Sequence, residues 1–184
     1  HASIHLRYGD LTDSWKVLDN LDWLSCQERT ELERFSHPGR RQAWLVGRWL
    51  SKQLIRENHP EPVKGLQCFS ICSVDDHLRP TRPTIFLNQR KLPYALSITH
   101  SDTNLLVALS TSSETQVGVD LCRLTPLPPS FLQSWFTDSE RERISRISEE
   151  NQQRTKEICR LWAAKEAIYK ACNRGESFAP HQVE

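Results

Sequence analysis

The stretch RTKEICRLWAAKEAIYKAC, residues 154–172, has the clearest helical pattern in the chain. Trp162, Glu166 and Lys170 follow one another at intervals of four residues, so they share one face of the predicted helix, and Lys165 lies beside that face. Two interpretations of these charges stay open. They form an ion pair on the surface of an amphipathic helix, or they are the charged groups of a functional site.

A similar pattern occurs in the first half of the chain, where residues 40–58 (RRQAWLVGRWLSKQLIREN) predict a second long helix. Each long helix follows a capping-box sequence, which predicts the start of a short helix. This correspondence predicts an internal duplication. Because the first half has neutral Gln53 where the second has Glu166, a charged site between the halves would be built once. The aligned pairs are Ser25 with Thr137, Glu28 with Glu140, Arg29 with Arg141, Trp49 with Trp162, Lys52 with Lys165, Gln53 with Glu166, and Ile55 with Ile168.

Short apolar segments between the helical regions predict β-strands. A helical region restarts at Ser130, after a proline-rich turn. Helices and strands in this order predict an α+β fold of two lobes, residues 1–95 and residues 96–184. The predicted strands are residues 66–74, 84–88, 95–99, 104–110 and 116–121.

Bulk composition excludes several classes of protein. The formal net charge of +1 argues against a nucleic-acid partner, and no apolar run is long enough for a membrane partner to be expected. Six cysteines are too few for a disulfide scaffold, and their spacing does not match a structural zinc site. Reduced thiols and the absence of a signal-peptide pattern predict a cytoplasmic location.

Two strand ends carry candidate functional groups. Asp120 closes the segment GVD, residues 118–120, where a carboxylate could hold a divalent cation or cap a turn. Thr99 and His100 follow the apolar segment ALSI, residues 95–98. The imidazole could bind a phosphate or a ribose hydroxyl, or it could have a structural role.

The order of these motifs is more restrictive than any one of them. A histidine strand, an aspartate strand and a Trp-x-x-Lys-Glu-Ala helix resemble the 4'-phosphopantetheinyl transferase superfamily, in particular the larger two-lobed type that activates surfactin synthetase. Thr81-Arg82-Pro83 is similar to the family's Gly-Lys/Arg-Pro, and the resemblance runs from about residue 25 to residue 184.

The resemblance implies a pseudo-duplicated two-lobe fold, in which each lobe is a small antiparallel sheet packed with helices. It implies a monomer with internal pseudo-twofold symmetry. Similar proteins continue for several strands after the last helix, so the second lobe is expected to be incomplete at its end.

It also implies an activity, which is transfer of the 4'-phosphopantetheine group from coenzyme A to a serine of an apo acyl or peptidyl carrier protein. The other product is 3',5'-ADP. Coenzyme A would lie between the lobes with Mg²⁺ bridging its pyrophosphate. The carriers would serve fatty acid, polyketide or nonribosomal peptide synthesis.

Matching the motifs residue by residue makes Asp120 and Glu166 the metal ligands, and Glu166 also the general base. Lys170 and Lys165 match lysines that stabilise charge on the phosphates. Cys122 stands where the family often has another acidic residue, so water in that coordination position, or a preference for Mn²⁺, is expected. The residues expected to bind coenzyme A are Arg41, whose role Arg40 could take, Arg48, Arg82, Thr99, His100 and Lys165.

Two other functions compete with this one. A non-catalytic protein of the same fold could bind coenzyme A or a nucleotide without turnover. A helical nucleic-acid module could be built on residues 40–49, although the near-zero net charge argues against it.

Overall fold

The computed structural model describes residues 3–14, 17, 19–75, 77, 79–148 and 152–172. Its longest helix, α3 (Pro38–Asn58), confirms the prediction for residues 40–58 and begins two residues earlier. His37 precedes the helix and its side chain accepts a hydrogen bond from the Arg40 amide, while Pro38 supplies a backbone torsion suited to the first turn. The buried face of α3 includes Ala43, Val46, Leu54 and Ile55.

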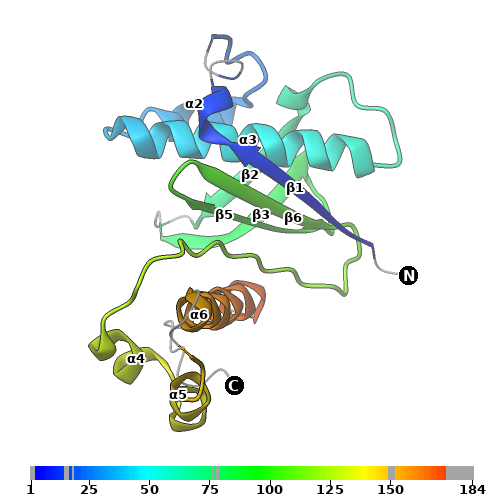
Figure 1. Ribbon diagram of the computed structural model, residues 1–184. Helices are drawn as coiled ribbons and strands as arrows, with labels where there is room; N and C mark the ends of the chain where they lie inside the picture. Colours follow the sequence, from blue (N-terminus) through cyan, green and yellow to red (C-terminus); the bar gives the residue numbers. More distant parts are fainter. Residues whose placement is uncertain are drawn as a thin grey trace.

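Helix α3 packs on the first of two three-stranded antiparallel sheets (Figure 1). This sheet has the order β1 (Ile4–Asp10), β6 (Asn104–Ser110), β5 (Ala95–Ser101). Strand β1 was not predicted. Its apolar side chains Ile4, Leu6 and Tyr8 are exposed, so it contributes little to the core, although their alternation is a strand signal.

The second sheet has the order β2 (Phe69–Val74), β3 (Pro80–Leu87), β4 (Arg90–Lys91). Asn88 and Gln89 have φ of 48° and 70°, the left-handed torsions of a tight hairpin turn between β3 and β4. Short 3-10 helices η1 (Leu11–Ser14) and η2 (Leu66–Cys68) precede α2 and β2. One hydrophobic core joins both sheets to α3, and its buried residues are Leu54, Ile55, Phe69, Ile71, Ile85, Leu92, Leu96, Val107 and Leu109.

After β6, the described part of the chain has three helices, α4 (Pro129–Trp135), α5 (Asp138–Ser145) and α6 (Gln153–Cys172). Helix α6 confirms the pattern of residues 154–172. Phe136, Ile144 and Ile158 form a separate small core between these helices. Figure 1 shows α6 on the side of the sheets opposite α3, with an extended segment of chain between the sheets and α6.

That extended segment corrects the prediction of a strand at residues 116–121. The structure has no strand there, and residues 115–128 run without regular secondary structure. The Val119 amide donates a hydrogen bond to the Ser97 hydroxyl at 3.1 Å, so it is satisfied by a side chain of β5 and not by a backbone ladder. The segment is held by side chains on one side and by α6 on the other.

Both predicted capping boxes are present, at α2 (Cys26–Leu32) and at α5. The glutamate of each box pairs with a lysine of the following long helix. Glu28 pairs with Lys52, and Glu140 pairs with Lys165 at 2.9 Å. Three of the aligned pairs of positions therefore make equivalent contacts, namely Ser25 and Thr137, Glu28 and Glu140, and Lys52 and Lys165, while the pseudo-twofold symmetry stays a prediction.

The predicted α+β class with small antiparallel sheets packed by helices is confirmed. The lobe boundary between residues 95 and 96 stays a prediction, and the pairing of β1 with β6 gives the first sheet strands from both sides of it. None of the helices in the described part of the chain combines the length and the apolar character that crossing a membrane would need.

Candidate active site

Two carboxylates from distant parts of the sequence meet around one ammonium group. Asp120 lies on the extended segment, and Glu166 and Lys170 lie one turn apart on α6. The Lys170 Nζ is 2.5 Å from Asp120 Oδ1 and 3.7 Å from Glu166 Oε2. The Thr99 hydroxyl donates a hydrogen bond of 2.9 Å to the same Asp120 oxygen. We call Asp120, Glu166, Lys170 and Thr99 the carboxylate cluster.

The environment of Glu166 makes its carboxyl more basic than usual. Partial burial raises the pKa of Glu166, and the neighbouring negative charge of Asp120 raises it further. The Lys170 ammonium acts in the opposite direction, but the net effect is an elevated pKa. A carboxylate with a raised pKa is a better proton acceptor at neutral pH than an ordinary glutamate.

Gly118 allows the extended segment to approach α6 this closely. A Cβ at Gly118 would lie 1.8 Å from the Ala167 carbonyl oxygen and 2.7 Å from the Ala171 amide nitrogen. Both atoms belong to helix backbone and cannot move aside. The sequence analysis did not assign a role to this glycine, although its position two residues before Asp120 is a signal of close backbone approach.

Gly118→Ala should separate the extended segment from α6. We expect a loss of about 1–3 kcal/mol in the free energy of unfolding, measured by urea titration, because the added methyl has no free space. Binding of a divalent cation should weaken as well, since Asp120 and Glu166 would move apart. Gly39→Ala is a suitable control, because a Cβ there meets only the His37 side chain, at 3.3 Å. Equal stability of the two variants would contradict this account.

A cavity of ≈ 740 Å³ lies beside the carboxylate cluster. Of the predicted coenzyme A residues, Arg48, Arg82 and His100 line it, and so does Lys170. Arg40 was predicted from the sequence only as a substitute for Arg41, and the aromatic residues that line the cavity were not predicted. These further lining residues include Phe35, Arg40, Trp44 and Tyr169.

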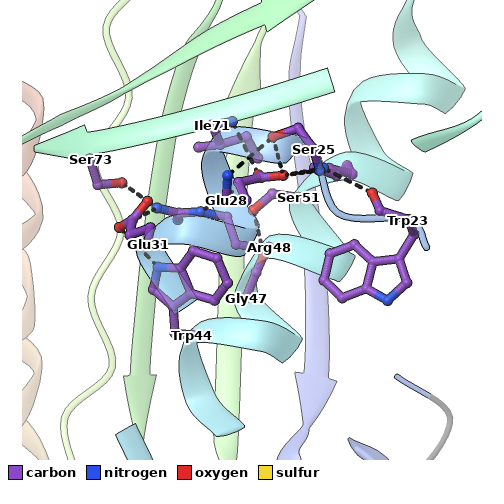
Figure 2. A network of polar contacts seen from close by, with 11 residues as sticks. Trp23, Ser25, Glu28, Glu31, Trp44, Gly47, Arg48, Ser51, Ile71 and Ser73 are labelled. Atoms are coloured by element: carbon purple, nitrogen blue, oxygen red, sulfur yellow. Dashed lines mark hydrogen bonds and ion pairs between the residues drawn. The ribbon is translucent and has the colours of Figure 1, made fainter. Parts of the chain in front are cut away.

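Arg48 is almost completely buried in a polar network at the floor of the cavity (Figure 2). Its Nη2 donates to the Ser73 hydroxyl at 2.8 Å and lies 3.7 Å from Glu31 Oε1. The guanidinium stands over the Trp44 ring at 4.9 Å. Burial lowers the pKa of Arg48, and the carboxylates of Glu31 and then Glu28 counteract this effect.

The same network buries an ion pair behind Arg48. Lys52 and Glu28 have side-chain exposures of 0% and 1%, and the Lys52 ammonium also donates to the Trp23 carbonyl at 3.0 Å. Glu28 accepts hydrogen bonds from the Ser25 and Ile71 amides, which ties α2 to β2. Figure 2 shows Ser25 and Glu28, at the start of α2, close to Ile71 of β2. Because Arg48 lines the cavity, the ion pair behind it helps to hold that part of the lining in place.

Two buried nitrogens of arginines that line the cavity have no hydrogen-bond partner among the described residues. They are the Nε atoms of Arg48 and Arg82. Arg82 donates from Nη1 to Gln116 at 2.8 Å, so the guanidinium is held but not saturated. A buried donor left unpaired is costly, and an anionic ligand in the cavity would relieve that cost.

Three of the residues predicted to bind coenzyme A do not line the cavity: Thr99, which belongs to the carboxylate cluster, and Arg41 and Lys165. Arg41 is not among the described residues that line it, and its Nη1 donates to the Leu32 carbonyl at 2.9 Å. Lys165 is 3% exposed and pairs with Glu140. Its ammonium also stands over the Phe136 ring, at 5.9 Å. The roles of Arg41 and Lys165 in catalysis or coenzyme A binding stay predictions.

Cys122 lies near the carboxylate cluster. Burial raises the pKa of its thiol to about 12, and the neighbouring Cys159 and carboxylates add to the effect. The group therefore stays protonated at neutral pH. A neutral thiol is a poor ligand for a hard cation, as expected from its type.

The cluster fits a hard divalent cation. Its oxygen donors are two carboxylates, the Thr99 hydroxyl and the Val119 carbonyl, and all of them already lie near one positive group, Lys170. Mg²⁺ is bound in many enzymes by one or two carboxylates, with water and phosphate oxygens completing its shell. Within the described ranges, no set of three or more His, Cys, Asp or Glu side chains is arranged for a metal. A site built from the two carboxylates would thus need oxygens from water or substrate.

Comparison with known proteins agrees with this geometry. Residues 116–184 match the family model of the 4'-phosphopantetheinyl transferase superfamily. The matched region contains both Asp120 and Glu166. The chain is also 28% identical over 162 residues to a Synechocystis protein provisionally named a 4'-phosphopantetheinyl transferase, covering 87% of this chain and 61% of that protein. Over residues 116–184, the chain is therefore similar to this transferase superfamily.

A solved structure is also similar, an apo-ACPS structure from Chronobacterium ammoiniagenes. The match has a TM-score of 0.45 and 15% sequence identity, and it covers 60% of this chain and 95% of the other. A likeness at this level supports no conclusion about function. The chain spans 61% of the length of the curated relative, so the activity of the whole protein is a matter of proposal.

Proposed function

We propose that this chain transfers the 4'-phosphopantetheine group of coenzyme A to a serine of an acyl or peptidyl carrier protein, as a transferase of the two-lobed, surfactin-synthetase-activating type. The observation that carries the proposal is the meeting of Asp120 and Glu166 beside a cavity lined by basic residues. A cation-binding pair next to an anion-binding wall is what a pyrophosphate substrate requires.

In this proposal, different residues of the cavity bind different parts of coenzyme A. Arg82 and Arg48 would donate hydrogen bonds from their guanidinium groups to phosphate oxygens, and His100 would contact the nucleotide end. In this arrangement Arg40 takes the role predicted for Arg41, because Arg40 lines the cavity.

Asp120 and Glu166 would hold Mg²⁺, or Mn²⁺ in its place. When bound, the ion supplies neutralisation of the negative charge on the pyrophosphate. Thr99 fixes Asp120 through its hydrogen bond, so we propose that it positions a ligand and does not itself bind coenzyme A.

In the proposed reaction, Glu166 accepts the proton of the carrier serine hydroxyl, directly or through a water molecule. The serine oxygen forms a bond to the phosphorus next to the pantetheine arm. The bond from that phosphorus to the bridging oxygen breaks, and 3',5'-ADP leaves with the electron pair. Lys170 stabilises the charge that develops on the phosphate oxygens.

Lys165 has a supporting place in this proposal. Its buried pair with Glu140 fixes α6 on α5, which sets the position of the neighbouring Glu166. In the first half, Lys52 forms the same kind of buried pair with Glu28. The residue after Lys52 is the neutral Gln53, whereas the residue after Lys165 is Glu166. The lysine pair thus occurs in both halves, but the glutamate after it occurs only in the second. This favours a positioning role for Lys165.

Mass spectrometry tests the proposal. Purified chain, Mg²⁺, coenzyme A and an apo carrier protein should give carrier with one added phosphopantetheine group. A carrier with its acceptor serine changed to alanine should remain unmodified. Carriers of fatty acid, polyketide and nonribosomal peptide synthesis should each be tried, because all of them would offer the same acceptor group, a serine hydroxyl.

A second function has one observation in its favour. The protonated thiol of Cys122 near the cluster suits a protein that binds coenzyme A without turnover. Calorimetric binding of coenzyme A, together with unmodified carriers of every class, would support that function and contradict transfer. The cytoplasm as the place of either function stays a prediction.

A further inference from the structure

The ammonium group of Lys170 occupies the centre of the oxygen donors described above. Its Nζ is 2.5 Å from Asp120 Oδ1, and it donates hydrogen bonds of 3.3 Å to Thr99 Oγ1 and to the Val119 carbonyl. Glu166 Oε2 completes the set at 3.7 Å. Four oxygen atoms from three segments of the chain thus surround one positive charge.

These contacts cannot all persist when a divalent cation enters. Mg²⁺ binds oxygen at about 2.0–2.1 Å. An ion on Asp120 Oδ1 would come close to the Lys170 Nζ, which now lies 2.5 Å from that oxygen, and the two positive groups would repel each other. The ion and the ammonium therefore compete for the oxygens of the cluster.

The Lys170 ammonium can move from the carboxylate cluster into the cavity. Its side chain is 30% exposed and also lines the cavity beside Arg82 and His100. The residue lies in the last turn of α6, and its flexible four-carbon stem lets the ammonium move without a change in the backbone. In the cavity the charge would point toward the place proposed for phosphate.

We propose that Lys170 is a resident counter-ion of the carboxylate cluster, which an entering divalent cation displaces into the cavity. In the metal-free protein, Lys170 holds Asp120 and Glu166 together against their mutual repulsion. When the ion displaces Lys170, the ammonium group joins the basic residues of the cavity that are proposed to bind phosphate. The phosphate part of this inference depends on the proposed function, whereas the displacement itself does not.

Cation and anion binding are then coupled in both directions. An ion in the cluster makes Lys170 available to an anion, and an anion that binds Lys170 removes the competitor of the ion. Arg48 and Arg82 cannot take part in this exchange, because the described contacts hold them to Ser73 and Gln116. Lys170 is therefore a positioning residue for the carboxylates first and a phosphate ligand second.

The first test uses wild-type protein without coenzyme A. Lysines are labelled with a limiting amine-reactive reagent, with and without saturating Mg²⁺, and the extent at each lysine is measured by mass spectrometry. Labelling of Lys170 should rise several-fold with Mg²⁺, while Lys156, an exposed lysine on the same helix, should stay constant. Unchanged labelling of Lys170 in Mg²⁺ would overturn the proposal.

The second test measures Mn²⁺ affinity by electron paramagnetic resonance, again without coenzyme A. Lys170→Met should bind Mn²⁺ on the order of tenfold more tightly than wild type, because the competitor is gone. Lys156→Met controls for the loss of one positive charge, and Asp120→Asn should abolish binding. Equal or weaker affinity of Lys170→Met would contradict the exchange, and so would a failure of every variant to bind Mn²⁺. Absence of arm transfer alone would count only against the proposed function.

Discussion

Glu166→Gln is expected to lower the rate of arm transfer by a factor of about 10²–10⁴, the usual contribution of a positioned general base. The amide has nearly the shape of the carboxylate, so α6 and its pair with Glu140 should be undisturbed. It can neither accept the serine proton nor contribute a negative charge to the cluster. The raised pKa of Glu166, caused by burial and by Asp120, marks this carboxyl as the basic member of the pair.

The measurement is single-turnover transfer to an apo carrier, followed by mass spectrometry. Glu157→Gln is the matched control, since Glu157 lies on α6 in ion pairs with Arg143 and Arg160 that do not involve the carboxylate cluster. That variant should keep wild-type activity. If Glu166→Gln also transferred the arm at the wild-type rate, another group would have to be the base.

The largest expected loss of stability comes from Lys52→Met. This change removes the nearest counter-charge of the Glu28 carboxylate, which is 1% exposed, and leaves only the more distant Arg48, whose Nε lies 4.0 Å from Glu28 Oε1. Breaking a buried ion pair by removing one partner costs about 3–5 kcal/mol. The loss should appear as a lower midpoint in urea unfolding followed by circular dichroism.

Two comparisons isolate the charge from the loss of contacts. Arg79→Met breaks an exposed pair with Asp75 and should cost less than about 1 kcal/mol. The double variant Glu28→Gln with Lys52→Met should recover part of the loss, because it removes the buried negative charge, and the single amide oxygen can still accept from either the Ser25 or the Ile71 amide. A double variant less stable than Lys52→Met alone would show that the buried charge is not the cause.

Local signals in the sequence predicted the helices well. The capping boxes at Ser25 and Thr137 depend only on nearby residues, and both formed as predicted. Strand β1 was missed because the sequence cannot show that residue 4 pairs with residue 110. The predicted strand at residues 116–121 failed for a related reason, since its amides are satisfied by side chains and its neighbour is a helix.

The site was predictable only in part. Pattern alone left Asp120 as a turn cap or a ligand, and the link to Glu166 came from the resemblance to a family. Helical phase decides that Arg40 and not Arg41 lines the cavity, because adjacent residues point about 100° apart on a helix. The buried partner of Lys165 follows from the internal repeat, since Lys52 and Glu28 occupy the aligned positions.

The pairing of β1 with β6 has a consequence for synthesis on the ribosome. Ile4 is made before its partner Ser110, which follows only after most of the first sheet and all of the second have been made. At translation speeds of 5–20 residues per second, this delay is roughly 5–20 s. During that interval the apolar side chains Ile4, Leu6 and Tyr8 have no partner strand, so β1 joins the first sheet only after the intervening residues have been synthesised.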